Sequence, residues 1–466
     1  MRGVPAIFFP QRPALQLDSH GVTPRAWRKI SWAFGQLKSG KVAAAGLREL
    51  LEWSIDERQV HRLGQRAGRE MQEQLQQQVA AWEQQQAERR LTEPPPRCAA
   101  APPNAPQAVA IEMDGGRFRA RAEDAGHGVF QPHWREMKAG CLLRLQSVEQ
   151  ACDPHPELPR AFLDRPGVQK LVKQLHAQHG NPSAAQGAAE KGPHSGESAA
   201  ETTIADLLEA APPIPTAVPE RPARLRPEAQ DSWRPRRLVR TCVASQEAVE
   251  AFGGMLAAEA AARGFDQAPR KAFLGDGGSA NWSVHERHFR QYVPIVDFVH
   301  LLSYVYGVAM CVSRQAEEGW EQFQRWIRAV WQGQGADVFH EWQALARRHQ
   351  LPASPLPPTD PRHALQRGVT YLRNNLSRID YPRYRRLGLP VTSTLVESLI
   401  KEFNYRVKGT EKFWDDPSGA EAILTLRAAL LSEDDRFNAF FAQRPGCSHR
   451  RRSTLPRRQR CNSTAA

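Results

Sequence analysis

VAIEMDGGRFRAR, at residues 109–121, and KAFLGDGGSANW, at residues 271–282, are the two stretches that decide the fold this sequence predicts. In each, an apolar run leads to an aspartate that two glycines follow. Short apolar runs bounded by turn residues indicate buried strands, and a glycine pair predicts a turn. We therefore expect two strands that each end at an aspartate, Asp114 in the first stretch and Asp276 in the second.

Other segments predict further strands and many helices. Strands are expected at RFRAR, EMKAGCLLRLQSV, RLVRTCVAS and YVPIVDFV, and a helix at QEAVEAFGGMLAAEAAARG, ended by Gly264. Residues 315–380 are expected to be helical and carry four tryptophans, which predict a packed core more than a DNA-intercalating wedge. The pattern predicts a mixed α/β core interrupted by an all-α insertion.

The bulk composition narrows the class of protein. The chain has 466 residues and a formal net charge of +13, which suits a polyanionic partner such as nucleic acid, although charge for solubility is the simpler alternative. Seven cysteines without a CxxC pair predict neither a zinc site nor a disulfide framework. No apolar run approaches the roughly 20 residues that span a bilayer, and no signal peptide is expected, so we predict a cytoplasmic protein without a membrane partner.

The N-terminal region predicts a helix-turn-helix. One helix, KVAAAGLRELLEW, places Val42, Leu47 and Leu50 on one face, and Ser54 with Glu57 forms a capping box that begins a second helix. In the second helix the predicted buried stripe is Val60, Leu63, Ala67 and Met71. The residues expected to face outward toward DNA are Gln59, Arg62, Gln65, Arg66 and Arg69. An ordinary helical hairpin has the same pattern and stays an alternative.

Three carboxylates from separate elements form the candidate catalytic site. Asp114 and Asp276 follow strands, and Glu397 lies on a helix after the all-α block. Carboxylate oxygens suit Mg²⁺ or Mn²⁺, and two such ions about 3.5–4 Å apart can promote phosphoryl transfer. Taken singly, each Asp-Gly-Gly is better explained as an ordinary turn; the surrounding residues favour a site.

Several segments together resemble the DDE transposases of bacterial insertion sequences, with a Mutator-like arrangement closest to the ISKra-type group. They are VAIEMDGGRFRAR, HWREMKAGCLL, FLGDGGSANW, VPIVDFVHLLSYVY, STLVESLIKEFNYRVKGTEKFW and AILTLRAALLSED. The resemblance implies an RNase H-like core that holds two Mg²⁺ or Mn²⁺ ions on the catalytic residues Asp114, Asp276 and Glu397. It further implies an accessory role for Asp297 and His300, and an all-α insertion between Asp276 and Glu397.

Phosphate contacts are also expected beside Glu397. Lys401, Asn404, Arg406 and Lys408 follow it at helical spacing, although a solvated basic helix face would look the same.

The expected organisation divides the chain into eight parts. They are a helix-turn-helix region (1–92), a Pro-rich linker (93–105), the first part of the core (106–180), a low-complexity insertion (181–237), the second part of the core (238–300), the α-helical insertion (301–390), the last part of the core (391–440) and a basic tail (441–466).

The sequence therefore predicts a transposase that binds the ends of an insertion sequence and catalyses metal-dependent cleavage and strand transfer of double-stranded DNA. A homodimer or larger assembly on DNA is expected, associated with the nucleoid when bound. The alternatives are a transposase-derived protein that only binds DNA, and a metal-dependent RNase H-like nuclease.

Overall fold

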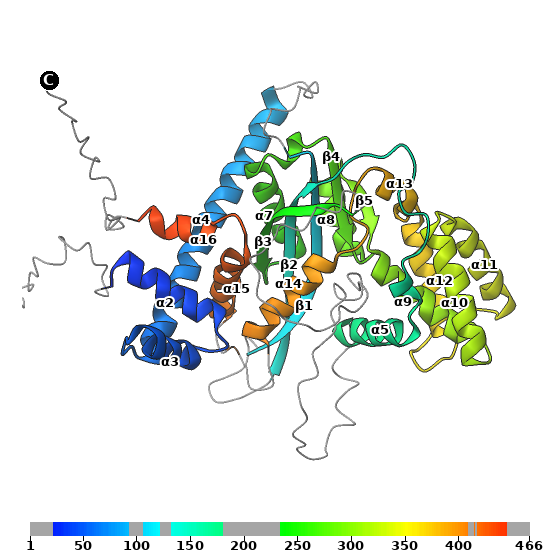
Figure 1. The fold of residues 1–466 in the computed structure, drawn as a ribbon, viewed down its shortest axis with the longest axis horizontal. Helices are drawn as coiled ribbons and strands as arrows, with labels where there is room; N and C mark the ends of the chain where they lie inside the picture. The colour runs from blue at the N-terminus through cyan, green and yellow to red at the C-terminus, as the bar shows by residue number, and fades with distance from the viewer. Residues whose placement is uncertain are drawn as a thin grey trace, which may run out of the picture.

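The centre of the protein is a five-stranded mixed sheet in the order β3-β2-β1-β4-β5 (Figure 1). The computed structural model describes residues 22–92, 106–121, 132–179, 234–408, 414 and 417–444. β1 pairs antiparallel with β2 and β2 with β3, whereas β1, β4 and β5 run parallel. The strands are β1 (Ala108–Arg121), β2 (Pro132–Gln146), β3 (Arg236–Ser245), β4 (Arg270–Gly275) and β5 (Val293–Val296). The expected mixed α/β class is confirmed.

The predicted turn after Asp114 is wrong, because β1 is one continuous strand of 14 residues. Asp114 and the two glycines after it pair with Ala139, Lys138 and Met137 of β2. A Cβ atom on Gly116 would lie 2.7 Å from Cε of Met137, so glycine here leaves room for this side chain of β2. The long pairing with β2 therefore overrides the local turn propensity of the glycines. The strands predicted around β3, β4 and β5 are present.

Helices cover both faces of the sheet. On one face, α14 (Thr394–Val407) lies across β1 and β2, and α15 (Pro417–Leu431) packs on β3. On the other, α7 (Val249–Ala262) packs on β2 and β3, and a Cβ on Gly140 would lie 2.6 Å from Cδ2 of its Leu256. As predicted, α7 is followed by Gly264, which has a left-handed φ of 67°. α8 (Ser279–His288) packs against α7 and β4.

A helical block extends from the β5 side of the sheet, at the opposite end of the molecule from the N-terminal helices (Figure 1). It consists of α9 (Phe298–Val312), α10 (Ala316–Trp331), α11 (Gly335–Arg348), α12 (His363–Asn375) and α13 (Tyr381–Arg386), with η4 (Leu376–Arg378) between the last two. Trp326, Trp331 and Trp342 are buried and Trp320 is partly buried against the same core, so the prediction that the four tryptophans contribute to the core is confirmed. η1 (Arg160–Leu163) and α5 (Arg165–His179) follow β2, and α5 packs on α9.

The N-terminal helices are α2 (Pro24–Gln36), α3 (Gly40–Leu51) and α4 (Glu57–Thr92). The predicted stripe of α4 is buried as expected, and α4 packs against α2, α3, α7 and α15. A Cβ on Gly68 would lie 2.0 Å from the carbonyl oxygen of Ala422, so glycine lets α4 lie directly on α15. The face predicted for α3 is partly wrong: Leu47 is buried, whereas Val42 and Leu50 are exposed.

Two buried arginines join α2 to the core. Nε of Arg406 on α14 donates to the Phe34 carbonyl at 3.1 Å, and Nη1 of Arg427 on α15 donates to the Gly35 carbonyl at 2.6 Å. Both acceptors belong to the last turn of α2, whose carbonyls lack partners within the helix. The predicted DNA contact by Arg406 does not fit this position, because its side chain is buried over the ring of Phe34, at 4.8 Å from the centroid.

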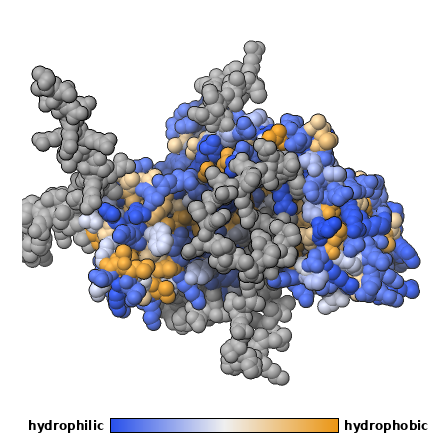
Figure 2. All heavy atoms as spheres, viewed as in Figure 1, coloured by the Kyte–Doolittle hydropathy of each residue, from blue (hydrophilic) through white to orange (hydrophobic). Residues whose placement is uncertain are grey.

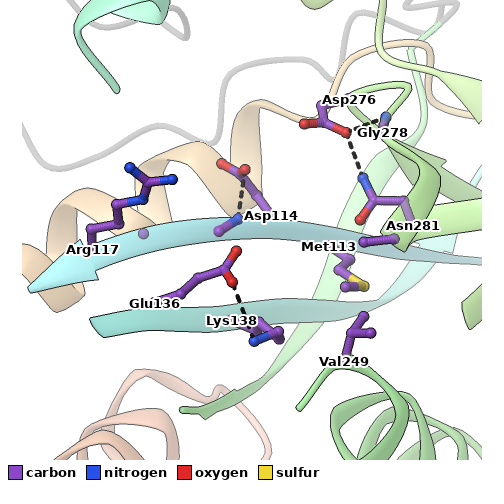
Figure 3. Close-up of a pocket in the computed structure, with 12 residues that line it drawn as sticks. Met113, Asp114, Arg117, Glu136, Lys138, Val249, Asp276, Gly278 and Asn281 are labelled. Atoms are coloured by element: carbon purple, nitrogen blue, oxygen red, sulfur yellow. Dashed lines mark hydrogen bonds and ion pairs between the residues drawn. The ribbon is translucent and has the colours of Figure 1, made fainter. Parts of the chain in front are cut away.

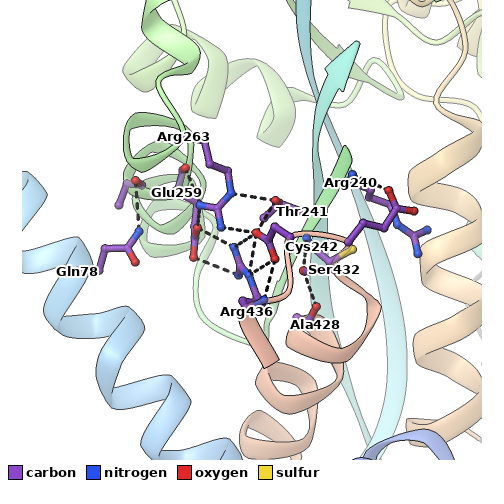
Figure 4. A network of polar contacts seen from close by, with 12 residues as sticks. Gln78, Arg240, Thr241, Cys242, Glu259, Arg263, Ala428, Ser432 and Arg436 are labelled. Carbon is purple, nitrogen blue, oxygen red and sulfur yellow. Dashed lines mark hydrogen bonds and ion pairs between the residues drawn. The ribbon is translucent and has the colours of Figure 1, made fainter. Parts of the chain in front are cut away.

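A second polar network joins α7, β3 and α16 (Arg436–Ala442) (Figure 4). Nη2 of Arg263 lies 2.6 Å from Oδ2 of Asp434, and Nη2 of Arg436 lies 2.9 Å from Oε2 of Glu259. Burial alone would raise the pKa of Asp434, but the two arginines outweigh it and lower that pKa strongly. Two acids and two arginines balance each other, so the charges stay paired where α16 meets α7.

The surface is mostly hydrophilic in the view of Figure 2, apart from an apolar patch over the region of α2 and α3. Exposed large apolar residues there include Trp32, Val42 and Leu50. Within the described part of the chain, no helix has both the length and the apolar character needed to cross a membrane.

We predict that Arg406→Gln destabilises the fold by about 1–3 kcal/mol, because the Phe34 carbonyl loses its charged donor inside the protein. Lys408→Gln is the control, since Lys408 is exposed on the same helix end and exposed substitutions change stability by less than about 0.5 kcal/mol. Urea unfolding measures both variants. Equal stabilities of the two would show that Arg406 does not fasten α2 to the core.

Candidate active site

Asp114 lies within β1, and Asp276 directly follows β4, the neighbouring parallel strand. β1 and β4 pair in register up to Glu112 opposite Leu274. Two residues further along, β1 reaches Asp114 while β4 has just ended before Asp276. Parallel neighbours are about 4.8 Å apart, so the two aspartates arise side by side where β4 ends. They line one pocket of about 350 Å³ (Figure 3).

The carboxylate of Asp276 is oriented by its own loop. Its Oδ1 accepts hydrogen bonds from the Gly278 amide at 2.8 Å and from Nδ2 of Asn281 at 2.7 Å. Its other oxygen points toward Asp114 in Figure 3. Gly277, between the aspartate and α8, has a φ of 93°, which side chains other than glycine rarely adopt. The second Asp-Gly-Gly is therefore a turn, and the turn aims a carboxylate into the pocket.

Asp114 sits on the rigid strand and is largely buried, with 9% of its surface exposed. Burial raises its pKa to about 6; the negative charges of Asp276 and Asp297 add to the rise, and His300 opposes it. Because one pKa unit corresponds to about 1.4 kcal/mol, keeping Asp114 charged at neutral pH costs the protein free energy. A cation in the pocket would offset that cost.

Asp297 and His300 lie beside the pocket at the start of α9. Asp297 is fully buried and its carboxylate accepts the backbone amides of Val299 and His300, as an N-cap does. Its Oδ2 also lies 2.6 Å from Nδ1 of His300, which orients the imidazole ring. Asp297 is therefore the N-cap of α9. The Asp297 amide donates to the carbonyl of Gly275, the residue directly before Asp276, at 2.9 Å.

The start of α14 is attached to these elements. The Val396 amide donates to Oε2 of Glu112 at 3.1 Å, and the Ser393 amide donates to Oδ1 of Asp297 at 3.0 Å. Glu397 follows Val396 directly, so its backbone starts beside β1. The side chain of Glu397 lies outside the described part of the structure. Glu112 itself, buried in an apolar strand, was missed by the sequence reasoning.

The carboxylate oxygens in the pocket are the type of ligand that Mg²⁺ and Mn²⁺ prefer. Asp114 and Asp276 are the two described aspartates that line it. Among the residues that the structure describes, no group of three or more His, Cys, Asp or Glu side chains is arranged to hold a metal ion. A third ligand would have to come from a residue such as Glu397.

The pocket has further polar walls that the sequence did not single out. Arg117 and Glu136 face each other across β1 and β2, and Nζ of Lys138 lies 3.6 Å from Oε2 of Glu136. These charges alternate along the strands, next to two aspartates. Cross-strand pairing decides which of them lie together, so no short motif could have pointed to them.

The predicted DNA-contacting residues occupy different environments. On α4, Arg62 and Arg69 are exposed, and Gln59 and Gln65 are half-buried. Arg66 lies over the ring of Trp27, at 4.8 Å, and pairs with Glu70 at 2.8 Å.

On α14, the predicted contacts are also divided between surface and interior. Lys401 and Asn404 are half-buried and Lys408, which directly follows the helix, is exposed. These three therefore remain candidates for DNA contact, unlike the buried Arg406.

No protein-family model matches the chain, and no curated protein sequence matches it either.

We predict that Asp114→Asn stabilises the metal-free protein at pH 7.5 by about 1–3 kcal/mol. The folded-state pKa lies above the ordinary value of 3.8, so the contribution of Asp114 to stability is full below pH 4 and is lost as pH rises through 6. Thermal unfolding at pH 5 and pH 7.5 measures the stability difference between the variant and the wild type, which should be larger at pH 7.5. Adding Mg²⁺ at pH 7.5 should raise the melting temperature of the wild type alone. If Asp114→Asn is no more stable than the wild type at pH 7.5, the raised pKa of Asp114 is contradicted.

Proposed function

We propose that this protein is a DDE transposase that cuts the ends of an insertion sequence and joins them to target DNA. The observation that carries the proposal is the pair Asp114 and Asp276, which arise side by side where β4 ends beside β1 and line one pocket. Two carboxylates, one on a strand and one on the short loop that follows the adjacent strand, provide ligands for the cations that assist phosphoryl transfer.

The sheet supports the finer assignment of an RNase H-like core. Its order β3-β2-β1-β4-β5, with β2 alone antiparallel to its neighbours, is compatible with that fold. The helical block between Asp276 and Glu397 corresponds to the insertion that the resemblance implies.

In the proposed site, Asp114, Asp276 and Glu397 hold Mg²⁺ or Mn²⁺. When bound, the cations activate the attacking oxygen and stabilise the leaving oxygen of an in-line displacement. Asn281 and the Gly278 amide keep one oxygen of Asp276 engaged, so that the other faces the pocket. Asp297 holds the ring of His300 beside Asp114, an accessory electrostatic role that favours the charged carboxylate.

The DNA would approach as a polyanion to a chain whose net charge is +13. α3 and α4 would act as a helix-turn-helix that recognises the element ends, with Arg62 and Arg69 facing the duplex. Lys401 and Lys408 on the α14 side would hold phosphates nearer to the cleavage site. Two ends must be joined in one reaction, which favours a dimer or larger assembly.

We predict that Asp114→Asn, Asp276→Asn and Glu397→Gln each lower cleavage of a labelled duplex carrying the element ends by more than about a hundredfold, since small displacements of catalytic groups cost that much. Binding of the duplex should persist in all three. Asp266→Asn, an exposed aspartate before β4, is the control and should cleave normally.

The products distinguish the alternatives. Joining of the cut 3′ end to a second duplex indicates a transposase, whereas cutting without joining indicates a nuclease. End-specific binding with no cutting by the wild type would indicate a protein that only binds DNA. Cutting that survives the three substitutions would overturn the site.

We further predict that Arg62→Gln and Arg69→Gln each weaken binding to the element ends and reduce the slope of log affinity against log salt by about 1, because each removes one phosphate contact. Fluorescence anisotropy at several salt concentrations measures this. Arg348→Gln, an exposed arginine at the end of α11, is the control. An unchanged slope in both α4 variants would argue against α4 as the DNA-binding helix.

A further inference from the structure

The second aspartate reaches the pocket on a very short loop. Only Asp276, Gly277 and Gly278 separate the end of β4 from the first residue of α8. The Gly278 amide and Asn281, which fix Oδ1 of Asp276, belong to this loop and to α8. The direction of the carboxylate therefore depends on the backbone of the loop.

That backbone is held from outside the sheet by α12, almost a hundred residues later in the chain. The hydroxyl of Tyr371 donates to the Asp276 carbonyl oxygen at 2.8 Å. Nδ2 of Asn375, one helical turn on, donates to the Gly277 carbonyl at 3.3 Å. Oδ1 of Asn375 accepts from Nε1 of Trp282 on α8 at 2.8 Å, so the same side chain bonds both the loop and the helix that follows it.

The contact is rigid and closely packed. Tyr371 is 7% exposed and Asn375 1% exposed, and the ring of Tyr371 stacks on Tyr304 of α9 with centroids 3.8 Å apart. Burial raises the pKa of Tyr371, which keeps its hydroxyl protonated and donating. A Cβ on Gly277 would lie 2.5 Å from Cε2 of Tyr371, so the loop has no room to shift toward the helix.

We propose that Tyr371 and Asn375 are positioning residues through which the helical block sets the orientation of the Asp276 carboxylate. The inference rests on the proposed function, since it deepens the account of the same site. Neither side chain lines the pocket; each acts through main-chain carbonyls of the loop. Without these two bonds the loop samples more conformations, and the two aspartates hold a cation less well.

Tyr371→Phe is the decisive variant, because it removes one hydroxyl and keeps the stacked ring. Tyr304→Phe is the matched control: it removes the hydroxyl of the other ring in the same stack, which accepts from Arg367 at 3.2 Å and not from the loop. Asn375→Ser is the second variant; it shortens the side chain that bridges Gly277 and Trp282. Melting temperatures of all variants establish that each is folded.

Three measurements test the proposal. Mn²⁺ binding to the protein alone, followed by electron paramagnetic resonance of the free ion, should weaken roughly threefold to tenfold in Tyr371→Phe, the effect of one hydrogen bond. The Mg²⁺ concentration for half-maximal DNA cleavage should rise by the same factor, while the rate at saturating Mn²⁺ recovers. Amide hydrogen exchange in a peptide covering residues 275–281 should be faster. Tyr304→Phe should match the wild type in all three.

The outcomes separate this proposal from the proposed function. The positioning role would be overturned if Tyr371→Phe and Asn375→Ser match the wild type in Mn²⁺ binding, DNA cleavage and amide hydrogen exchange. That result would leave the transposase proposal intact. A wild-type protein that neither binds Mn²⁺ nor cleaves DNA would overturn the proposed function. It would also overturn a positioning role in catalysis, even if hydrogen exchange showed that Tyr371 stabilises the loop. Weaker binding in Tyr304→Phe equal to that in Tyr371→Phe would indicate general loosening of the helical block and also overturn the proposal.

Discussion

The parallel pairing of β1 with β4 is the interaction on which the rest of this structure depends. It brings Asp114 and Asp276 to one pocket although they are 162 positions apart in the sequence. A register shift of one residue would turn the side chains of β1 to the opposite face of the sheet. Glu112 could then no longer accept the hydrogen bond from the Val396 amide of α14. Because β1 also pairs with β2 and β4 also pairs with β5, neither β1 nor β4 is an edge strand of the sheet.

Asp114 and Asp276 are held in place by different parts of the protein. Asp114 is part of a long strand and is paired there with β2, and its burial makes the charged form costly in the absence of a cation. Asp276 lies on a loop whose shape depends on α8 and α12. The helical block therefore supports one half of the site and leaves the other half to the sheet.

The opposite end of the molecule is joined to the core as firmly. The last turn of α2 is bound by Arg406 and Arg427 from the core helices, and α4 lies directly on α15 at Gly68. Helices α2 to α4 thus form one packed body with the sheet layer, and the outward residues of α4 keep a set position relative to the pocket. For a protein that would hold DNA at both places, this rigidity fixes the distance between recognition and cleavage.

The sequence by itself determined β3, β4 and β5, α7 with its glycine end, the buried stripe of α4 and the tryptophan core, because these follow from the local alternation of apolar and polar residues. It also pointed to both aspartates. Only the tertiary structure decided that Asp114 lies inside a strand and that Glu112, Tyr371 and Arg406 anchor other elements. Their partners are 284, 95 and 372 positions away. Such contacts depend on which surfaces meet in three dimensions, and no local pattern encodes that.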